Sequence, residues 1–309
     1  MQKQKISIEL VGGLGNQLFC YFAGLYISDK TSSRVKFVQN AIPKKHPQHN
    51  SKIGDLNFPA SIKTSKLNFF LARIFIRMLD SISFRVPFIN KLKNYGIYSE
   101  QRIGVDNECM EIQRKLDKRI FKKKLILKGF YQDISYYREF VKSRGIHPVH
   151  PKDPSDEYIK LISSKRLVNL TIIHIRRGDF DHFKREIGVL TSTYYSSAVN
   201  ELLKREKQIE IVVVSDEPER AKAIFPQNFP FIPISYTNNF NLKNPAELLL
   251  AMSFAKNLII SNSTFSLWSA IFSHNTKNIF YPQPFNFNLP MKVSGFPSSW
   301  IPIPAEFEK

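Results

Sequence analysis

The stretch VNLTIIHIRRGDF, residues 168–180, places two adjacent arginines directly after a largely apolar, β-branched run. The run from Val168 to Ile175 has the composition of a strand that is covered on both faces of a parallel sheet. In open α/β folds, ligands bind just beyond the carboxyl ends of such strands. Arg176 and Arg177 therefore indicate either an anion site at this strand end or a solvated basic turn.

The chemistry of arginine narrows the kind of anion. A guanidinium presents fixed, planar donors that match phosphate oxygens in pairs. Gly178 follows the arginine pair and lets the backbone turn sharply and approach a ligand. A phosphorylated ligand is therefore the anion that this turn favours.

Two further stretches combine a predicted strand, a polar turn and the start of a predicted helix. This arrangement directs backbone N–H groups toward an anion, although a tight turn or plain helix capping explains it as well. The first is GGLGNQ after a strand at 5–11, and its spacing matches neither the dinucleotide fingerprint nor the P-loop. The second is SNSTF after a strand at 258–260. The residues of interest at the two turns are Gly13, Asn16, Gln17, Ser261, Asn262, Ser263, Thr264 and Phe265.

A carboxylate stands at the end of another predicted strand, residues 209–214. Asp216 either caps the next helix, with Pro218 in its first turn, or holds a ribose or base edge. Asn244 and Glu247 have the spacing of a capping box at a later helix start. Strands and helices alternate through the second half of the chain, which predicts a parallel, doubly wound sheet.

Length and composition indicate a globular protein of two domains. The chain has 309 residues, of which 43% are hydrophobic and 23% charged. The proline-rich stretch HPVHPKDP at 147–154 is the predicted linker, so we expect domains at 1–150 and 151–290, with 291–309 as a tail packing back across both. No apolar run is long enough to span a bilayer, and the start of the sequence lacks the apolar core of a signal peptide. Cys20 and Cys109 are expected to be free thiols in a reducing compartment.

The net charge of +19 bears on partners rather than on fold. Nucleic acid, an anionic membrane and phosphate-bearing substrates would all be attracted to it. The sequence has no zinc-finger, zipper or RNA-recognition signature, which favours a membrane surface and a phosphorylated ligand over nucleic acid. Residues 65–82 place apolar side chains on one helical stripe and basic ones off it. They predict either a core helix of the first domain or a basic amphipathic helix on an anionic membrane.

Taken together, the motifs resemble a known family, the bacterial α-1,2-fucosyltransferases of glycosyltransferase family 11. The matching segments occur in the family's order and span nearly the whole chain, although residues 30–120 fit loosely. The family usually has two adjacent tryptophans after the SNS turn. This chain has Leu267 and Trp268 there, a change that we expect to affect packing rather than chemistry. The segments are GGLGNQLF at Gly12–Phe19, GFYQDISYY at Gly129–Tyr137, HIRRGDF at His174–Phe180, VVVSDEPERAKAIF at Val212–Phe225 and PAELLLAMSFAKNLIISNSTFSLWSA at Pro245–Ala270.

The resemblance implies an α/β fold of the GT-B type, with two Rossmann-like domains facing a central cleft. Residues 1–150 would form the acceptor side and residues 151–290 would bind the donor nucleotide. The implied reaction is inverting transfer of L-fucose from GDP-fucose to a galactose 2-hydroxyl of a glycan, in surface polysaccharide or lipopolysaccharide O-antigen synthesis, with no cofactor and no essential metal. The implied location is the bacterial cytoplasm, where the acceptor could be lipid-linked and the protein could contact the inner face of the membrane peripherally.

The resemblance also implies roles for individual residues. Arg176 and Arg177 would face the donor pyrophosphate. Asp216 and the Ser261–Phe265 turn would border the nucleotide, and Asn16 would reach the reaction centre from the other domain. Such arginines stabilise the negative charge of departing GDP more in the transition state than in the ground state.

An acceptor hydroxyl must also lose a proton during transfer, and a carboxylate or imidazole would help. Asp179 and His174 are the candidates for this base, although Asp179 could instead orient an arginine. Asp179-Phe180-Asp181 also spells the D-x-D letters of metal-dependent glycosyltransferases, which is a competing interpretation. Two others are a non-catalytic nucleic-acid-binding protein and a related transferase that uses another nucleotide sugar.

Overall fold

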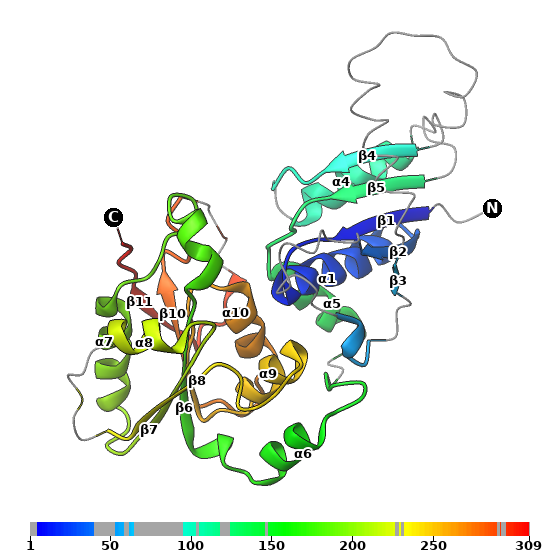
Figure 1. The fold of residues 1–309 in the computed structure, drawn as a ribbon. Coiled ribbons are helices and arrows are strands. Elements are labelled where there is room, and N and C mark those ends of the chain that lie inside the picture. Colours follow the sequence, from blue (N-terminus) through cyan, green and yellow to red (C-terminus); the bar gives the residue numbers. More distant parts are fainter. Residues whose placement is uncertain are drawn as a thin grey trace. The chain divides into compact units, whose positions relative to one another are not determined.

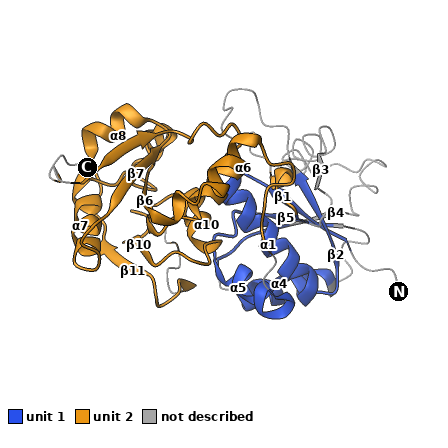
Figure 2. Ribbon diagram, turned by 90° about the horizontal axis from the view of Figure 1, so that it is seen from below, with its two compact units in different colours: residues 1–50, 58–147 blue, residues 51–57, 148–309 orange. Residues whose placement is uncertain are grey.

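The computed structural model divides the chain into two compact units, residues 1–50 with 58–147 and residues 51–57 with 148–309 (Figure 2). The division at 147/148 falls inside the proline-rich stretch that was predicted as the linker. The structure describes residues 5–39, 53–58, 62–64, 95–102, 105–117, 124–145, 148–225, 229, 232–288, 291 and 295–308. The segment 65–82, predicted as a core or membrane helix, lies outside these residues.

The first unit is built on a parallel five-stranded sheet with the strand order β3-β2-β1-β5-β4 (Figure 1). Helix α1 begins four residues after β1 ends and packs against β1, β2 and α5, so β1, turn and α1 form the predicted strand–turn–helix unit. The strands are β1 (Lys5–Leu10), β2 (Arg34–Gln39), β3 (Ile62–Thr64), β4 (Tyr95–Ser99) and β5 (Lys124–Lys128). The helices are α1 (Leu14–Lys30), α4 (Val105–Asp117) and α5 (Ser135–Arg144).

Helix α1 is buried around most of its circumference because it lies directly on the sheet. Gly24 permits this close approach. A Cβ at Gly24 would lie 2.6 Å from the ring of Phe37 and 3.0 Å from Ile8, so no side chain fits between helix and strands. Cys20 and Cys109 are both free and buried, as predicted.

The second unit is built on a parallel six-stranded sheet with the order β11-β10-β9-β6-β7-β8 (Figure 1). The alternation of strands and helices through this unit confirms the prediction of a parallel α/β sheet. The strands are β6 (Leu170–Ile175), β7 (Glu210–Ser215), β8 (Ile234–Thr237), β9 (Asn257–Ile259), β10 (Asn278–Gln283) and β11 (Ile301–Pro304). The helices are α6 (Asp156–Ser163), α7 (Ser192–Leu203), α8 (Pro218–Ile224), α9 (Pro245–Met252) and α10 (Thr264–Ile271), with short 3₁₀ helices η2 (Ile53–Asp55), η3 (Leu167–Asn169) and η4 (Gly178–Phe183).

Strand β6 lies in the interior of this sheet between β9 and β7 and is buried along its whole length. It is shorter than predicted. Val168 belongs to the preceding 3₁₀ turn, and its side chain is 45% exposed. Leu267 and Trp268 are fully buried on α10, which agrees with the packing role expected at these positions.

Two predicted helix caps differ from the structure. Asp216 does not cap α8, because its carboxylate turns back toward the loop after β6, and the Ser215 hydroxyl accepts the Glu217 N–H instead. Asn244 caps α9 as predicted, by accepting the Ala246 N–H. Glu247 does not close a capping box.

The carboxylate of Glu247 instead holds the start of α6. It accepts the Ser155 N–H at 2.6 Å and the Ser155 hydroxyl at 2.8 Å. The predicted tail is not a separate segment either. Strand β11 pairs with β10 at the edge of the second sheet, so the described tail residues are part of the second unit. Among the described residues, no helix is both long and apolar enough to cross a membrane.

Candidate active site

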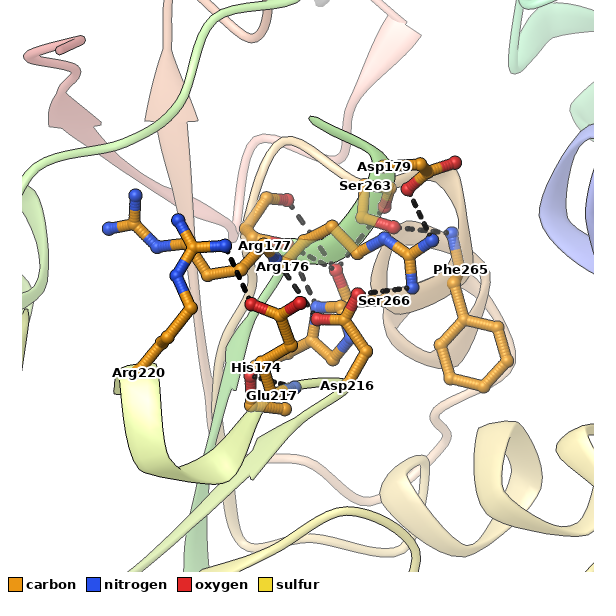
Figure 3. Close-up of polar contacts among 12 residues, drawn as sticks. His174, Arg176, Arg177, Asp179, Asp216, Glu217, Arg220, Ser263, Phe265 and Ser266 are labelled. Carbon is orange, nitrogen blue, oxygen red and sulfur yellow. Dashed lines mark hydrogen bonds and ion pairs between the residues drawn. The ribbon is translucent and has the colours of Figure 1, made fainter. Parts of the chain in front are cut away.

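The loops that follow β6, β7 and β9 leave the second sheet at the carboxyl ends of its strands. These three strands are parallel neighbours, so their carboxyl ends bring together segments that are far apart in sequence. The end of β6 and its loop carry His174 to Asp179, and the other two loops carry Asp216 and Ser261 to Phe265 (Figure 3). The predicted convergence of these three motifs is therefore present in the structure.

Arg176 lies between two carboxylates at this edge (Figure 3). Its Nη2 is 2.6 Å from Asp179 Oδ1, and its Nη1 is 3.0 Å from Asp216 Oδ2. Its guanidinium also lies 5.6 Å from the centre of the Phe180 ring. The Arg176 side chain is 22% exposed, so the guanidinium has a fixed orientation and remains accessible to solvent.

Gly178 makes this arrangement possible. Its φ is +29°, and a Cβ there would lie 2.3 Å from Asp216 Oδ2. A side chain would therefore collide with the carboxylate that orients Arg176. The glycine is needed at this turn for the approach of a neighbouring loop as well as for its backbone conformation.

Arg177 does not face an open site, contrary to the expectation that both arginines do. Its side chain is 1% exposed. Its Nη1 forms an ion pair with Glu308, and its Nη2 donates to the Leu190 carbonyl at 2.9 Å. Its backbone N–H donates to Asp216 Oδ1 at 3.0 Å. The guanidinium of Arg177 therefore holds the loop, while Arg176 alone of the pair presents donors at the surface.

His174 is buried beneath the arginine loop. Its Nδ1 shares a hydrogen bond of 2.8 Å with the Ser261 hydroxyl, and its ring lies 5.9 Å from that of Phe265. Burial, assisted by the charge of Arg176, lowers the pKa of His174 from 6.5 to about 3. Such an imidazole is a weak base and is far from solvent, so the geometry does not support it as the general base. Its contact with Ser261 joins strand β6 to the loop after β9.

The Ser261–Phe265 turn is largely occupied by internal hydrogen bonds. Asn262 donates to the carbonyls of Ile187 and Gly188, at 3.1 and 3.0 Å. The Ser263 hydroxyl caps α10 by accepting the Phe265 N–H. The Ser263 contact corresponds to the capping interpretation of this turn, whereas Asn262 attaches the turn to the loop that precedes α7.

Ligand contact from this turn is most accessible at Thr264 and Phe265, which are half-buried. Ser261, Asn262 and Ser263 are buried. The turn therefore offers a hydroxyl and an aromatic ring at the start of α10, next to the β6 loop.

In the glycine turn of the first unit, one predicted ligand-binding side chain is buried and another is partly exposed. Gln17 is fully buried, and its Nε2 donates to the Gly12 carbonyl at 2.9 Å, so it braces the turn rather than facing a ligand. Gly13 has no side chain to cap α1 and leaves open space where a Cβ would be. Asn16 is half-buried, and its Oδ1 accepts from Gln132 Nε2 at 2.9 Å.

Gln132 and Glu100 belong to this part of the first unit and were not singled out individually from sequence. Glu100 Oε2 accepts the N–H groups of Phe130 and Tyr131, at 3.0 and 2.9 Å, and so holds the turn that presents Gln132. Gln132 lies in the recognised GFYQD segment, whereas Glu100 follows β4 without any motif around it. Only the sheet topology brings it to the turn after β5.

The D-x-D letters do not form a carboxylate pair directed at one point. Asp179 binds Arg176, and Asp181 lies 2.8 Å from Arg220 on α8. Each carboxylate thus has an arginine as its counter-ion. Within the described part of the chain, no three histidine, cysteine or acidic side chains come together as a metal site.

Comparison with known proteins shows similarity to glycosyltransferases. Residues 159–301 match the family model described as Glycosyl transferase family 11. An α-1,2-colitosyltransferase of Escherichia coli is 28% identical over 269 residues, which cover 85% of both chains. The O-antigen biosynthesis glycosyltransferase WbnK of Escherichia coli is 24% identical over 279 residues, or 84% of this chain and 88% of WbnK.

The fold resembles that of a mutant of Arabidopsis thaliana FUT1 in complex with GDP. The TM-score is 0.53 at 14% sequence identity, over 91% of this chain and 70% of that protein. The α/β fold of the GT-B type, with two Rossmann-like units, is therefore confirmed. The cleft expected between the two domains stays a prediction.

Proposed function

We propose that this chain, whose residues 159–301 match the model of glycosyltransferase family 11, transfers L-fucose from GDP-fucose to a galactose 2-hydroxyl of a glycan acceptor. One observation carries the proposal. Arg176, at the carboxyl end of β6, is clamped by two carboxylates and still has its guanidinium accessible to solvent. It is an oriented cation in the position where α/β folds bind nucleotides.

The clamp leaves donors for a phosphate. A guanidinium has five N–H groups, and the contacts with Asp179 and Asp216 account for two of them. A diphosphate would accept from the remaining donors without having to reorient the side chain. Because the orientation is fixed in advance, little free energy is lost to reorganisation when charge develops on the leaving group.

The reaction follows from this charge distribution. The acceptor hydroxyl attacks the anomeric carbon as the bond to the diphosphate breaks, which inverts the configuration at that carbon. Positive charge develops on the sugar ring and negative charge on GDP, and Arg176 stabilises the latter. Asp179 is one of the two carboxylates next to this arginine, and it either accepts the proton of the hydroxyl or serves only to orient Arg176.

The donor sugar has a specific alternative. The relative that is 28% identical is named for transfer of colitose, which lacks the 3-hydroxyl of fucose. GDP-colitose is therefore the alternative donor, and O-antigen glycans are the acceptors that the name of the second relative suggests. We place the reaction in the cytoplasm, at the membrane face where a lipid-linked acceptor would be found.

A donor panel tests the proposal. GDP-fucose, GDP-colitose, GDP-mannose and UDP-galactose are each incubated with galactose-terminated acceptors, and the released nucleotide and the new linkage are measured. We expect turnover with GDP-fucose and an α-1,2 linkage to galactose. Turnover with GDP-colitose alone would replace the donor, and turnover with UDP-galactose alone would overturn the proposal.

We further propose that the transfer requires no metal, because the carboxylates of Asp179 and Asp181 each have an arginine partner. The donor assay is repeated after dialysis against EDTA. The rate should be unchanged. Loss of activity that Mn²⁺ or Mg²⁺ restores would revive the D-x-D interpretation.

A further inference from the structure

We propose that Glu308 is a positioning residue of the donor site, acting through the buried guanidinium of Arg177. The proposal rests on the proposed function, since it concerns the same site. Residues 305–308 would then affect catalysis, although this segment follows β11 and lies more than a hundred positions from the arginine loop in sequence.

Residues 305–308 are bound along the loop that precedes α7. The Thr191 N–H donates to the Glu306 carbonyl at 2.9 Å, and the Glu308 N–H donates to the Val189 carbonyl at 2.8 Å. Leu190 and Phe307 form an antiparallel bridge between these two bonds. The 305–308 segment is therefore attached by its backbone to the loop that precedes α7.

Gly188 shows how closely the two segments pack. Its φ is +83°, and a Cβ there would lie 2.4 Å from the ring of Phe307. On its other side the loop is held by Asn262, which binds the carbonyls of Ile187 and Gly188. The loop is thus fixed between the 305–308 segment and the β9 turn.

Glu308 supplies the counter-ion that Arg177 needs. Arg177 is 1% exposed, and among the described residues Glu308 provides the carboxylate that pairs with its guanidinium. The other Glu308 oxygen lies 3.3 Å from Lys184 Nζ. The carboxylate therefore contacts the residues just before and just after η4. A buried guanidinium without its counter-ion is strongly unfavourable.

Loss of Glu308 would alter the position of Arg176 through Asp216. Asp216 binds both arginines, with Oδ1 accepting the Arg177 N–H and Oδ2 pairing with Arg176. If Arg177 lost its counter-ion, its guanidinium would move toward solvent or toward Asp216, and either change alters the clamp on Arg176. The expected result is weaker binding of the donor diphosphate with no change in acceptor binding.

Glu308→Gln tests this inference, with Glu306→Gln as the matched control. Glu306 lies in the same segment, and its carboxylate contacts only the exposed Thr191 hydroxyl among the described residues, at 3.2 Å. GDP affinity is measured by calorimetry, and kcat and KM are measured for donor and acceptor separately. We expect Glu308→Gln to weaken GDP binding at least tenfold and to leave the acceptor KM within twofold, while Glu306→Gln leaves all values within twofold. A folded Glu308→Gln variant with wild-type GDP affinity would overturn the proposal.

A double-variant cycle tests the route through Arg177. Glu308→Gln should have little additional effect in an Arg177→Met background, because the charge that Glu308 neutralises is then absent. A double variant that binds GDP tenfold more weakly than Arg177→Met alone would show that Glu308 acts by another route. If Glu308→Gln alone proves too unstable to assay, this comparison decides the proposal.

The two proposals fail in different ways. Wild-type protein that binds no GDP would refute the proposed function. The same cycle is then measured by thermal unfolding, where coupling between Glu308 and Arg177 is still expected. Additive changes in the unfolding temperature would refute the positioning role on their own.

Discussion

Arg176→Ala and Arg177→Ala should damage the protein in different ways, although the two residues are adjacent. Arg176 contacts two carboxylates whose side chains are 20% and 24% exposed, so its ion pairs are partly screened by solvent. Such pairs contribute about 0–1 kcal/mol each. Loss of a donor that stabilises charge in a transition state costs about 3 kcal/mol, or a factor of about 10²–10³ in rate.

Arg177→Ala removes a guanidinium that is 1% exposed, takes a donor from the Leu190 carbonyl, and leaves Glu308 with Lys184 as its remaining counter-ion. Breaking a buried ion pair in this way costs about 3–5 kcal/mol. For a domain of this size, that corresponds to a decrease in unfolding temperature of about 6–20 °C. A domain with about 5–15 kcal/mol of total stability would survive the change only in part.

The two variants are compared by thermal unfolding and by transfer rate per folded molecule. Arg176→Ala should unfold within about 8 °C of wild type, and its transfer rate should fall at least a hundredfold. Arg177→Ala should show a lower unfolding temperature and a smaller folded fraction. If Arg177→Ala unfolds like wild type and loses activity to the same extent as Arg176→Ala, the argument from burial is wrong and both arginines face the anion.

Three further variants test the surrounding structure. Gly178→Ala should lower the transfer rate at least tenfold in a steady-state assay, because its Cβ would displace the Asp216 carboxylate, and wild-type activity would contradict the turn geometry. Glu206→Leu should reduce the free energy of unfolding by about 1–3 kcal/mol, measured from the urea midpoint, because the buried amides of Asn257 and Asn278 lose an acceptor while Lys256 and Lys277 are exposed enough to be solvated. An unchanged midpoint would show that Glu206 contributes no net stability. His174 should make the free energy of unfolding depend on pH, because its pKa is about 3 in the folded protein and 6.5 in the unfolded chain. Its contribution to stability is therefore complete above pH 6.5 and falls by about 1.4 kcal/mol per pH unit below that pH. His174→Gln should therefore be less sensitive to acid in urea titrations at pH 7.5 and pH 5, and an identical slope in both proteins would contradict the burial argument.

The sequence was sufficient to predict the second unit because its pattern is local. The buried strand, the arginine pair and the Ser261–Phe265 turn each lie within a short stretch, and parallel strands necessarily bring their carboxyl ends to the same end of the sheet. The convergence of Arg176, Asp216 and Ser261 followed from that rule. The parallel sheet and the position of the linker required no knowledge of side-chain packing.

The roles within these motifs could not be assigned from sequence, because neighbours in the chain can face opposite sides. Arg176 and Arg177 look equivalent as letters, but one is accessible and the other is buried. Asp216 was a plausible helix cap until the structure placed its carboxylate on both arginines. Glu308 is the clearest case, since nothing near it in sequence indicates that its partner is Arg177.

GDP binding to wild type and Arg176→Ala, measured by calorimetry with UDP as the comparison nucleotide, tests the central claim most directly. We predict that wild type binds GDP more tightly than UDP, and that Arg176→Ala binds GDP at least tenfold more weakly while its unfolding temperature stays near that of wild type. Equal GDP affinity in the two proteins, or the absence of GDP binding to wild type, would contradict the assignment of this strand end as the donor site.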